Sequence, residues 1–158
     1  MKKLISHILI ALTGMLTVSC NAWLDVTPDN AIADDDLFST GFGYRNALNG
    51  IYTNLASDEL YGKQLSWGFL SAISQQYNQK AGTISPMYAD ASELIYNTVD
   101  TEPVVTTIWE KGYKVIANLN KLIENIQPTD ISLFEYGEEE KNLIYAEALS
   151  LRAMMHFD

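Results

Sequence analysis

The segment that most constrains the fold follows Thr101-Glu102-Pro103 and stops before Pro128. Its apolar residues recur at helical spacing along two adjacent stripes instead of one. A stripe this wide indicates a helix that neighbours contact on two sides. We therefore predict an all-α fold in which this helix lies inside a helical array. The first stripe contains Trp109, Tyr113, Ile116 and Ile123, all expected in the core, and the second contains Ile108, Val115, Leu119, Leu122 and Ile126.

Helical periodicity also precedes this segment. Tyr44, Leu48, Ile51 and Leu55 recur at three- and four-residue spacing, which predicts a helix with one buried face. The same repeat returns more weakly between residues 65 and 76. We expect a second, less regular helix there.

Two more helices are predicted from their start signals. Ser85 followed by Pro86 is typical of an N-cap and first helical position, and we expect that helix to run to about Asn97. The acidic run at residues 138–140 suits the positive end of a helix dipole and opens the last helix. Small residues on that helix would let the Trp109 helix approach as an antiparallel partner. We expect its buried face to contain Leu143, Ala146, Ser150, Ala153 and Phe157.

The N-terminus predicts a lipid anchor. Cys20 is the only cysteine, and it follows two lysines, an apolar run over residues 4–18 and the small residue Ser19. This order is typical of a bacterial lipoprotein signal peptide, here residues 1–19, with the acylated cysteine as mature N-terminus. The apolar run is shorter than the roughly 20 residues that a membrane-spanning helix needs. The alternative is an ordinary secreted protein in which Cys20 is a free thiol.

The net charge of the chain limits the classes of molecule that it can bind. The net charge of −10 becomes −12 when the signal peptide takes Lys2 and Lys3 away. A chain this acidic is unsuited to the phosphates of nucleic acids and to an anionic membrane surface. The polar, acidic residues 20–40 predict a tether and extended segment ahead of a helical domain at 41–158. The run Asp34-Asp35-Asp36 lacks the spacing of a cation-binding loop, so we expect no metal site there.

Four stretches together resemble the N-terminal part of the SusD/RagB family of surface lipoproteins from Bacteroidetes. The specificity of the resemblance comes from the order of these stretches after the predicted lipidation site at Cys20. The stretches are Trp23 to Pro28, which is similar to the family's LD..P motif; Ala47 to Tyr52, similar to l.giY; Ile108 to Asn118, similar to W...Y..I..aN; and Ala146 to Asp158, similar to EA.fLRA..yF.

The resemblance implies a fold of tetratricopeptide-like helix pairs with irregular connecting loops, here a truncated SusD-like fold. It implies a nutrient-binding lipoprotein, most often for glycans, that works with a SusC-type TonB-dependent transporter on the outward face of the outer membrane. It also implies a protein without enzymatic activity or cofactor. Two departures are His156 where the family has an aromatic residue, and the absence of an acidic export signal directly after Cys20.

Candidate ligand-binding residues lie in segments where apolar residues recur only weakly at helical spacing. Aromatic rings offer an apolar face to a sugar ring, and amides pair with its hydroxyls. The candidates are Trp67, Tyr77, Asn78, Tyr88 and Tyr96, with Gln79 beside them; local packing is the alternative for each. Trp109, Tyr113, Glu147 and Arg152 are expected to be structural, and Asn118 and Asn120 to bond between helices.

Catalytic signatures are missing from the sequence. No nucleophile elbow, phosphate-binding glycine loop or metal-ligand spacing occurs, and His156 has no cysteine partner. The functional alternative is a tetratricopeptide-like envelope scaffold that binds only protein partners. Because the apolar pattern runs undiminished to Phe157, we expect a longer protein, of which this incomplete domain would be less stable alone.

Overall fold

The computed structural model describes residues 34–77 and 84–158. Throughout these residues the regular structure is helical and contains no strand, in agreement with the predicted all-α class. The elements in chain order are α2 (Asp34–Leu37), α3 (Gly41–Leu55), α4 (Phe69–Ile73), α5 (Pro86–Ser92), α6 (Glu102–Ile126), the 3-10 turn η2 (Ile131–Leu133) and α7 (Gly137–Phe157).

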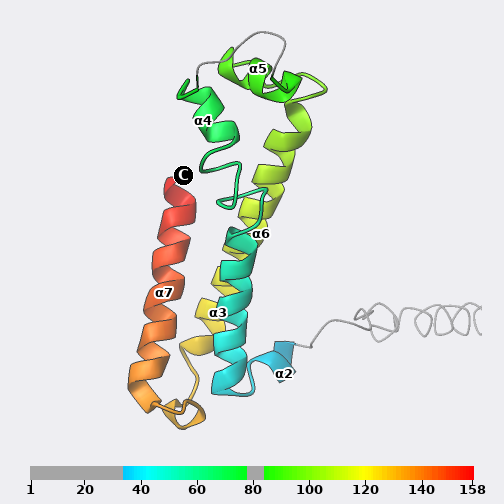
Figure 1. The fold of residues 1–158 in the computed structure, drawn as a ribbon. Coiled ribbons are helices and arrows are strands. Elements are labelled where there is room, and N and C mark those ends of the chain that lie inside the picture. The colour runs from blue at the N-terminus through cyan, green and yellow to red at the C-terminus, as the bar shows by residue number, and fades with distance from the viewer. Residues whose placement is uncertain (1–33, 78–83) are drawn as a thin grey trace, which may run out of the picture. The chain divides into compact units, whose positions relative to one another are not determined.

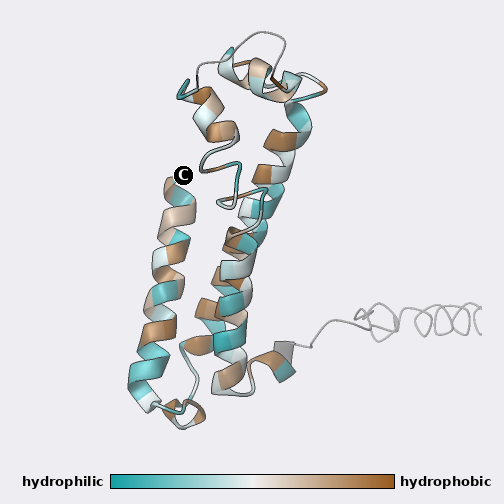
Figure 2. Ribbon diagram, in the orientation of Figure 1, coloured by the Kyte–Doolittle hydropathy of each residue, from teal (hydrophilic) through white to brown (hydrophobic). Residues whose placement is uncertain are grey.

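Three long helices form the body of the described domain. Helix α6 packs against both α3 and α7, and the chain direction alternates, so that α6 is antiparallel to each neighbour (Figure 1). The two-sided contact predicted from the wide apolar stripe of α6 is therefore confirmed. Hydrophobic and hydrophilic residues alternate along all three helices, as expected of helices with one face in a core (Figure 2).

The main core lies between α3, α6 and α7. Tyr44, Leu48, Ile51 and Leu55, the four residues predicted as the buried face of α3, are all buried. The second predicted stripe of α6 also faces the core. Four of its residues, Val115, Leu119, Leu122 and Ile126, are buried, and Ile108 packs against them. From the remaining elements the core receives Leu60, Phe134, Ile144 and Ala148.

A smaller apolar cluster joins α4 and α5 at the end of the domain where α6 begins (Figure 1). Both helices are shorter than predicted. Helix α4 stops after Ile73, close to Gln75 with φ 54°, and α5 ends at Ser92, close to Leu94 with φ 61°. A residue in this left-handed region cannot continue a right-handed helix. The predicted start of α5 is confirmed, since Ser85 is its N-cap and Pro86 its first residue.

The structure corrects two predicted faces. Trp109 and Tyr113 are 65% and 52% exposed, so the expectation that both lie in the core is wrong for the described domain. Helix α7 buries Ile144 and Ala148 rather than the predicted set of Leu143, Ala146, Ser150, Ala153 and Phe157, all of which are exposed. The pairing of α7 with α6 is nevertheless as predicted.

Polar bonds between helices match the structural roles that we expected. Arg152 Nη1 on α7 donates to Asn120 Oδ1 on α6 at 2.9 Å. Glu147 Oε2 on α7 accepts a bond from the hydroxyl of Tyr52 on α3, also at 2.9 Å. The ammonium group of Lys141 donates to the carbonyls of Gln127 and Thr129, which ties α7 to the end of α6. These bonds support a structural role for Arg152, Asn120 and Glu147.

The N-terminal predictions mostly lie outside the described residues. This applies to the signal peptide at 1–19, to Cys20 and to all but the last part of the predicted tether, which contains α2. Among the helices that the structure describes, none combines the length and the apolar character needed to span a membrane.

Candidate functional site

Trp67 and Tyr77 lie together beside α4. The indole N–H of Trp67 donates to the carbonyl of Gly62 at 3.1 Å, and the hydroxyl of Tyr77 donates to the carbonyl of Trp67 at 2.6 Å. Both side chains stay at least half exposed, at 58% and 50%. The two rings are thus held by polar bonds at their edges while much of their apolar surface faces solvent.

The ammonium group of Lys63 lies 5.8 Å from the centre of the Trp67 ring. A cation at this distance is attracted to the negative face of the indole, which helps to hold the ring in place. The backbone nearby is tightly folded, because Gly68 N–H donates to the carbonyl of Lys63 at 2.7 Å and Phe69 N–H donates to Gln64 Oε1 at 3.1 Å. Trp67 is therefore a restrained, exposed side chain rather than a freely rotating one.

Tyr96 and Tyr88 lie around the smaller apolar cluster. The ring centre of Tyr96 is 6.3 Å from that of Phe69, which is buried, and Tyr96 is 41% exposed. Tyr88 is half-buried and packs against the cluster formed by Phe69, Ala72 and Ala91. Packing is the stronger explanation for Tyr88, while Tyr96 keeps an accessible surface.

Of the predicted candidates, the four that the structure describes therefore lie around α4 and α5; they are Trp67, Tyr77, Tyr88 and Tyr96. Asn78 and Gln79 lie outside the described residues, directly after Tyr77 in the sequence. Exposed aromatic rings held in fixed positions can stack on the apolar faces of sugars, and neighbouring polar groups can bond to their hydroxyls. The arrangement is therefore suited to binding.

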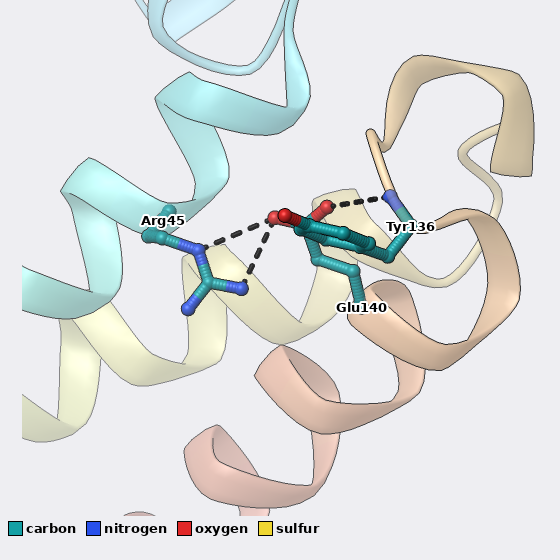
Figure 3. Close-up of polar contacts among 3 residues, drawn as sticks. All are labelled: Arg45, Tyr136 and Glu140. Carbon is teal, nitrogen blue, oxygen red and sulfur yellow. Dashed lines mark hydrogen bonds and ion pairs between the residues drawn. The ribbon is translucent and has the colours of Figure 1, made fainter.

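A second polar feature joins α3 to the start of α7. Nε and Nη2 of Arg45 donate to Glu140 Oε1 at 3.2 and 3.0 Å, and the backbone N–H of Tyr136 donates to Glu140 Oε2 at 3.2 Å (Figure 3). Glu140 is buried, with only 8% exposed. The bond from Tyr136 is the main cause that lowers the pKa of Glu140 below 4.5, and Arg45 adds to it against the opposing effect of desolvation.

No pattern in the sequence predicts the Arg45–Glu140 pair. Arg45 and Glu140 are 95 residues apart, and no local motif relates them. The prediction that the acidic run at 138–140 opens the last helix is confirmed, since Glu138, Glu139 and Glu140 all lie in the first turn of α7. Periodicity alone could not show that one of the three turns inward to meet a guanidinium group.

Trp109 and Tyr113 form another exposed aromatic pair. Their ring centres are 4.5 Å apart, and they line a cavity of about 240 Å³ together with Met155 and His156 of α7. Across residues 34–77 and 84–158, no three His, Cys, Asp or Glu side chains gather as metal ligands. His156 lies beside a mostly apolar groove.

Comparison with known proteins gives a family match along most of the chain. The model of a SusD-like family described as "Starch-binding associating with outer membrane" matches residues 22–158. SusD-like protein P25 of Formosa agariphila is 25% identical over 143 residues, which cover 88% of this chain and 26% of that protein. SusD-like protein P2 of the same organism is 26% identical over 163 residues, covering 99% of this chain and 29% of that protein.

The chain thus spans between a quarter and a third of the length of these two relatives. No solved structure matches it significantly.

Proposed function

The chain belongs to the SusD-like family, and from this membership we propose that it is part of a nutrient-binding lipoprotein that captures glycans at the outer membrane. The single observation that carries the proposal is the family match over residues 22–158. The chain has the all-α architecture that the resemblance implies. Binding without chemistry is the proposed role, because SusD-like proteins are binding proteins.

The proposed contact surface is the group of exposed aromatic residues around α4. Trp67, Tyr77 and Tyr96 would stack on sugar rings, and Asn78, next to Tyr77, would bond to hydroxyls. Support comes from the fixed but exposed rings of Trp67 and Tyr77, which lose little conformational entropy on binding. Tyr88 would contribute mainly by packing beneath this surface.

Cys20 would carry the lipid that anchors the protein, facing outward, in the outer membrane. We expect labelled palmitate to be incorporated into the wild-type chain and to be lost in Cys20→Ala. A Cys20→Ala protein that still takes up label or still sediments with outer membranes would contradict the anchor. Surface proteolysis of intact cells would test the outward orientation.

The proposed partner is a SusC-type TonB-dependent transporter, beside which the lipoprotein would hold its glycan for import. We expect such a transporter to co-purify from detergent-solubilised outer membranes with an affinity-tagged full chain. Co-purification of other envelope proteins alone, together with failure to bind any glycan, would favour an envelope scaffold instead.

A panel of glycans tests the proposed activity. We expect affinity electrophoresis of the full chain to show retardation by at least one polysaccharide, with starch first in the panel because of the family's description. Bovine serum albumin serves as the non-binding control. Unretarded migration with every polysaccharide would contradict glycan binding, and release of reducing ends would contradict a role without chemistry.

A further inference from the structure

An open cleft lies between the start of α3 and the start of α7, at the end of the described domain opposite α4 and α5 (Figure 1). Its volume is about 770 Å³, within the range of small-molecule binding sites. It is lined by Phe42 and Arg45 of α3, by Leu133 and Tyr136 around η2, and by Glu139, Glu140 and Leu143 of α7, among others. Nothing in the proposed function assigns a role to this cleft.

Apolar side chains are unusually exposed along its walls. Phe42 and Tyr136 are 75% and 71% exposed, and Leu133 and Leu143 are 42% and 51% exposed. Single exposed apolar residues are common, whereas four that line one concave surface indicate a place where a ligand or partner covers them. The two aromatic rings are the side chains best suited to stack on a flat apolar surface.

The frame of the cleft is held in a fixed position. At Gly41 a Cβ atom would lie 2.6 Å from the carbonyl oxygen of Leu133, so the two backbone segments approach as closely as glycine allows. Phe134, buried behind the cleft, packs its ring 5.4 Å from that of Tyr44. Because Glu140 bonds to both Arg45 and the backbone of Tyr136, the walls are joined at their base. The cleft is therefore preformed.

The charges that line the cleft disfavour one class of ligand. The carboxylates of Glu135, Glu139 and Glu140 outnumber the single guanidinium of Arg45, which disfavours anionic ligands such as phosphates or uronic acids. At the base, the Arg45–Glu140 pair is neutral as a unit, which suits hydroxyl groups better than a free cation. Arg45 has five N–H donors, of which two bond to Glu140, and its side chain is 39% exposed, so donors remain for ligand oxygens.

We propose that this cleft is a second carbohydrate-binding site, which takes a neutral oligosaccharide between Phe42 and Tyr136 and bonds its hydroxyls through Arg45 and Glu139. The choice of ligand class rests on the proposed function, whereas the position of the site rests on the cleft itself. A Lys-rich peptide is the competing occupant that an acidic, apolar cleft would also attract, and the test includes it.

The test uses fluorine NMR on the full chain labelled with 4-fluorophenylalanine, which places one probe on each of five phenylalanines. Phe42 reports on the cleft, Phe69 on the α4 region, and Phe157, which is 90% exposed, on non-specific effects. The signal of Phe42 is assigned with Phe42→Leu. The added ligands are maltoheptaose, cellohexaose, xylohexaose and a pentalysine peptide.

We expect a saturable shift of the Phe42 signal with at least one of the three glycans, and binding at least about tenfold weaker in Tyr136→Ala, since central aromatic contacts commonly carry binding energy of this size. Before ligand is added, an unchanged signal of buried Phe69, which does not line the cleft, will verify that this variant is folded. Val99→Ala, at a residue that is 86% exposed and does not line the cleft, serves as the matched control and should bind like the wild type.

Three results would refute the proposal of a second carbohydrate-binding site. The first is a Phe42 signal that no glycan moves; if Phe69 shifts in the same titration, glycan binding at α4 stands and only the cleft is refuted. The second is a Phe42 signal that moves with pentalysine alone, which would identify a protein-docking surface. The third is equal affinity of wild type and Tyr136→Ala.

Discussion

At the scale of single residues, the Arg45–Glu140 pair is a contact that local sequence patterns do not predict. Glu138, Glu139 and Glu140 look alike in the sequence, and all three suit the N-terminus of a helix. Only Glu140 is buried, because the start of α7 turns it toward α3, where Arg45 meets it. A contact between residues 95 positions apart depends on the packing of two helices, which no local spacing encodes.

Glu140→Gln is predicted to lower the free energy of unfolding by about 1 kcal/mol, because its bonds from Arg45 and Tyr136 would no longer be charge-assisted. Partial exposure of Arg45 keeps the loss this small. Glu138→Gln is the matched control and should change stability by less than about 0.5 kcal/mol. Urea denaturation of both variants measures the difference, and equal losses would refute the role of the pair.

The same pair predicts a pH dependence. The pKa of Glu140 is lower in the folded chain than its ordinary value of 4.5. A carboxyl group of this kind stabilises the fold at pH values above 4.5, and the contribution disappears as the pH falls through the lowered pKa. The difference in melting temperature between wild type and Glu140→Gln should therefore shrink when the pH falls from about 6 to about 3. A difference that stays constant would contradict this.

At the scale of elements, periodic segments were predictable and their ends were not. The buried face of α3 and the second stripe of α6 follow directly from their apolar spacing. Helix α5 ends before the predicted Asn97 because the chain turns at Leu94, whose left-handed backbone no sequence rule indicated. On α7, small and apolar residues occur on more than one face, so their spacing fits two registers, and the helix buries Ile144 and Ala148 rather than the predicted face.

Two glycines within α3 should respond oppositely to alanine. At Gly43 a Cβ atom would overlap the carbonyl oxygen of Leu37, so Gly43→Ala should destabilise the domain by about 1–3 kcal/mol. Gly50 has nothing within 4 Å of that position, so Gly50→Ala should stabilise the helix by about 0.5–1 kcal/mol. Thermal melts of the two variants check the pair, and a shift in the same direction would contradict the packing of α2 on α3.

At the scale of the whole molecule, the all-α class and the pairing of α6 with α7 were predictable because several helical segments agreed with one another. The surfaces were less predictable. Trp109 and Tyr113 lie on the same apolar stripe as Ile116 and Ile123, yet only the latter two are buried. Periodicity identifies the residues able to face a neighbour, and the arrangement of neighbours decides which of them do so.

From the exposed groove that Trp109 and Tyr113 line, we predict that the chain binds a hydrophobic dye and associates with itself. Replacing both residues with glutamine should reduce the fluorescence of a hydrophobic dye and shift sedimentation toward the monomer, since exposed apolar patches promote association. The replacement should cost little stability because both side chains are more than half exposed. Val99→Gln is the control for removal of an exposed apolar residue elsewhere. Unchanged dye binding in the double variant would contradict the role of the groove.

The proposed function is tested most directly by calorimetric titration of the full chain with the glycan that retards it most. Trp67→Ala combined with Tyr77→Ala should weaken binding by about tenfold or more, because these variants remove the two exposed aromatic rings that we propose stack on the glycan. Trp109→Ala combined with Tyr113→Ala, an equally exposed aromatic pair on α6, should leave the affinity unchanged. Equal affinity in wild type and the Trp67–Tyr77 variant would contradict the account.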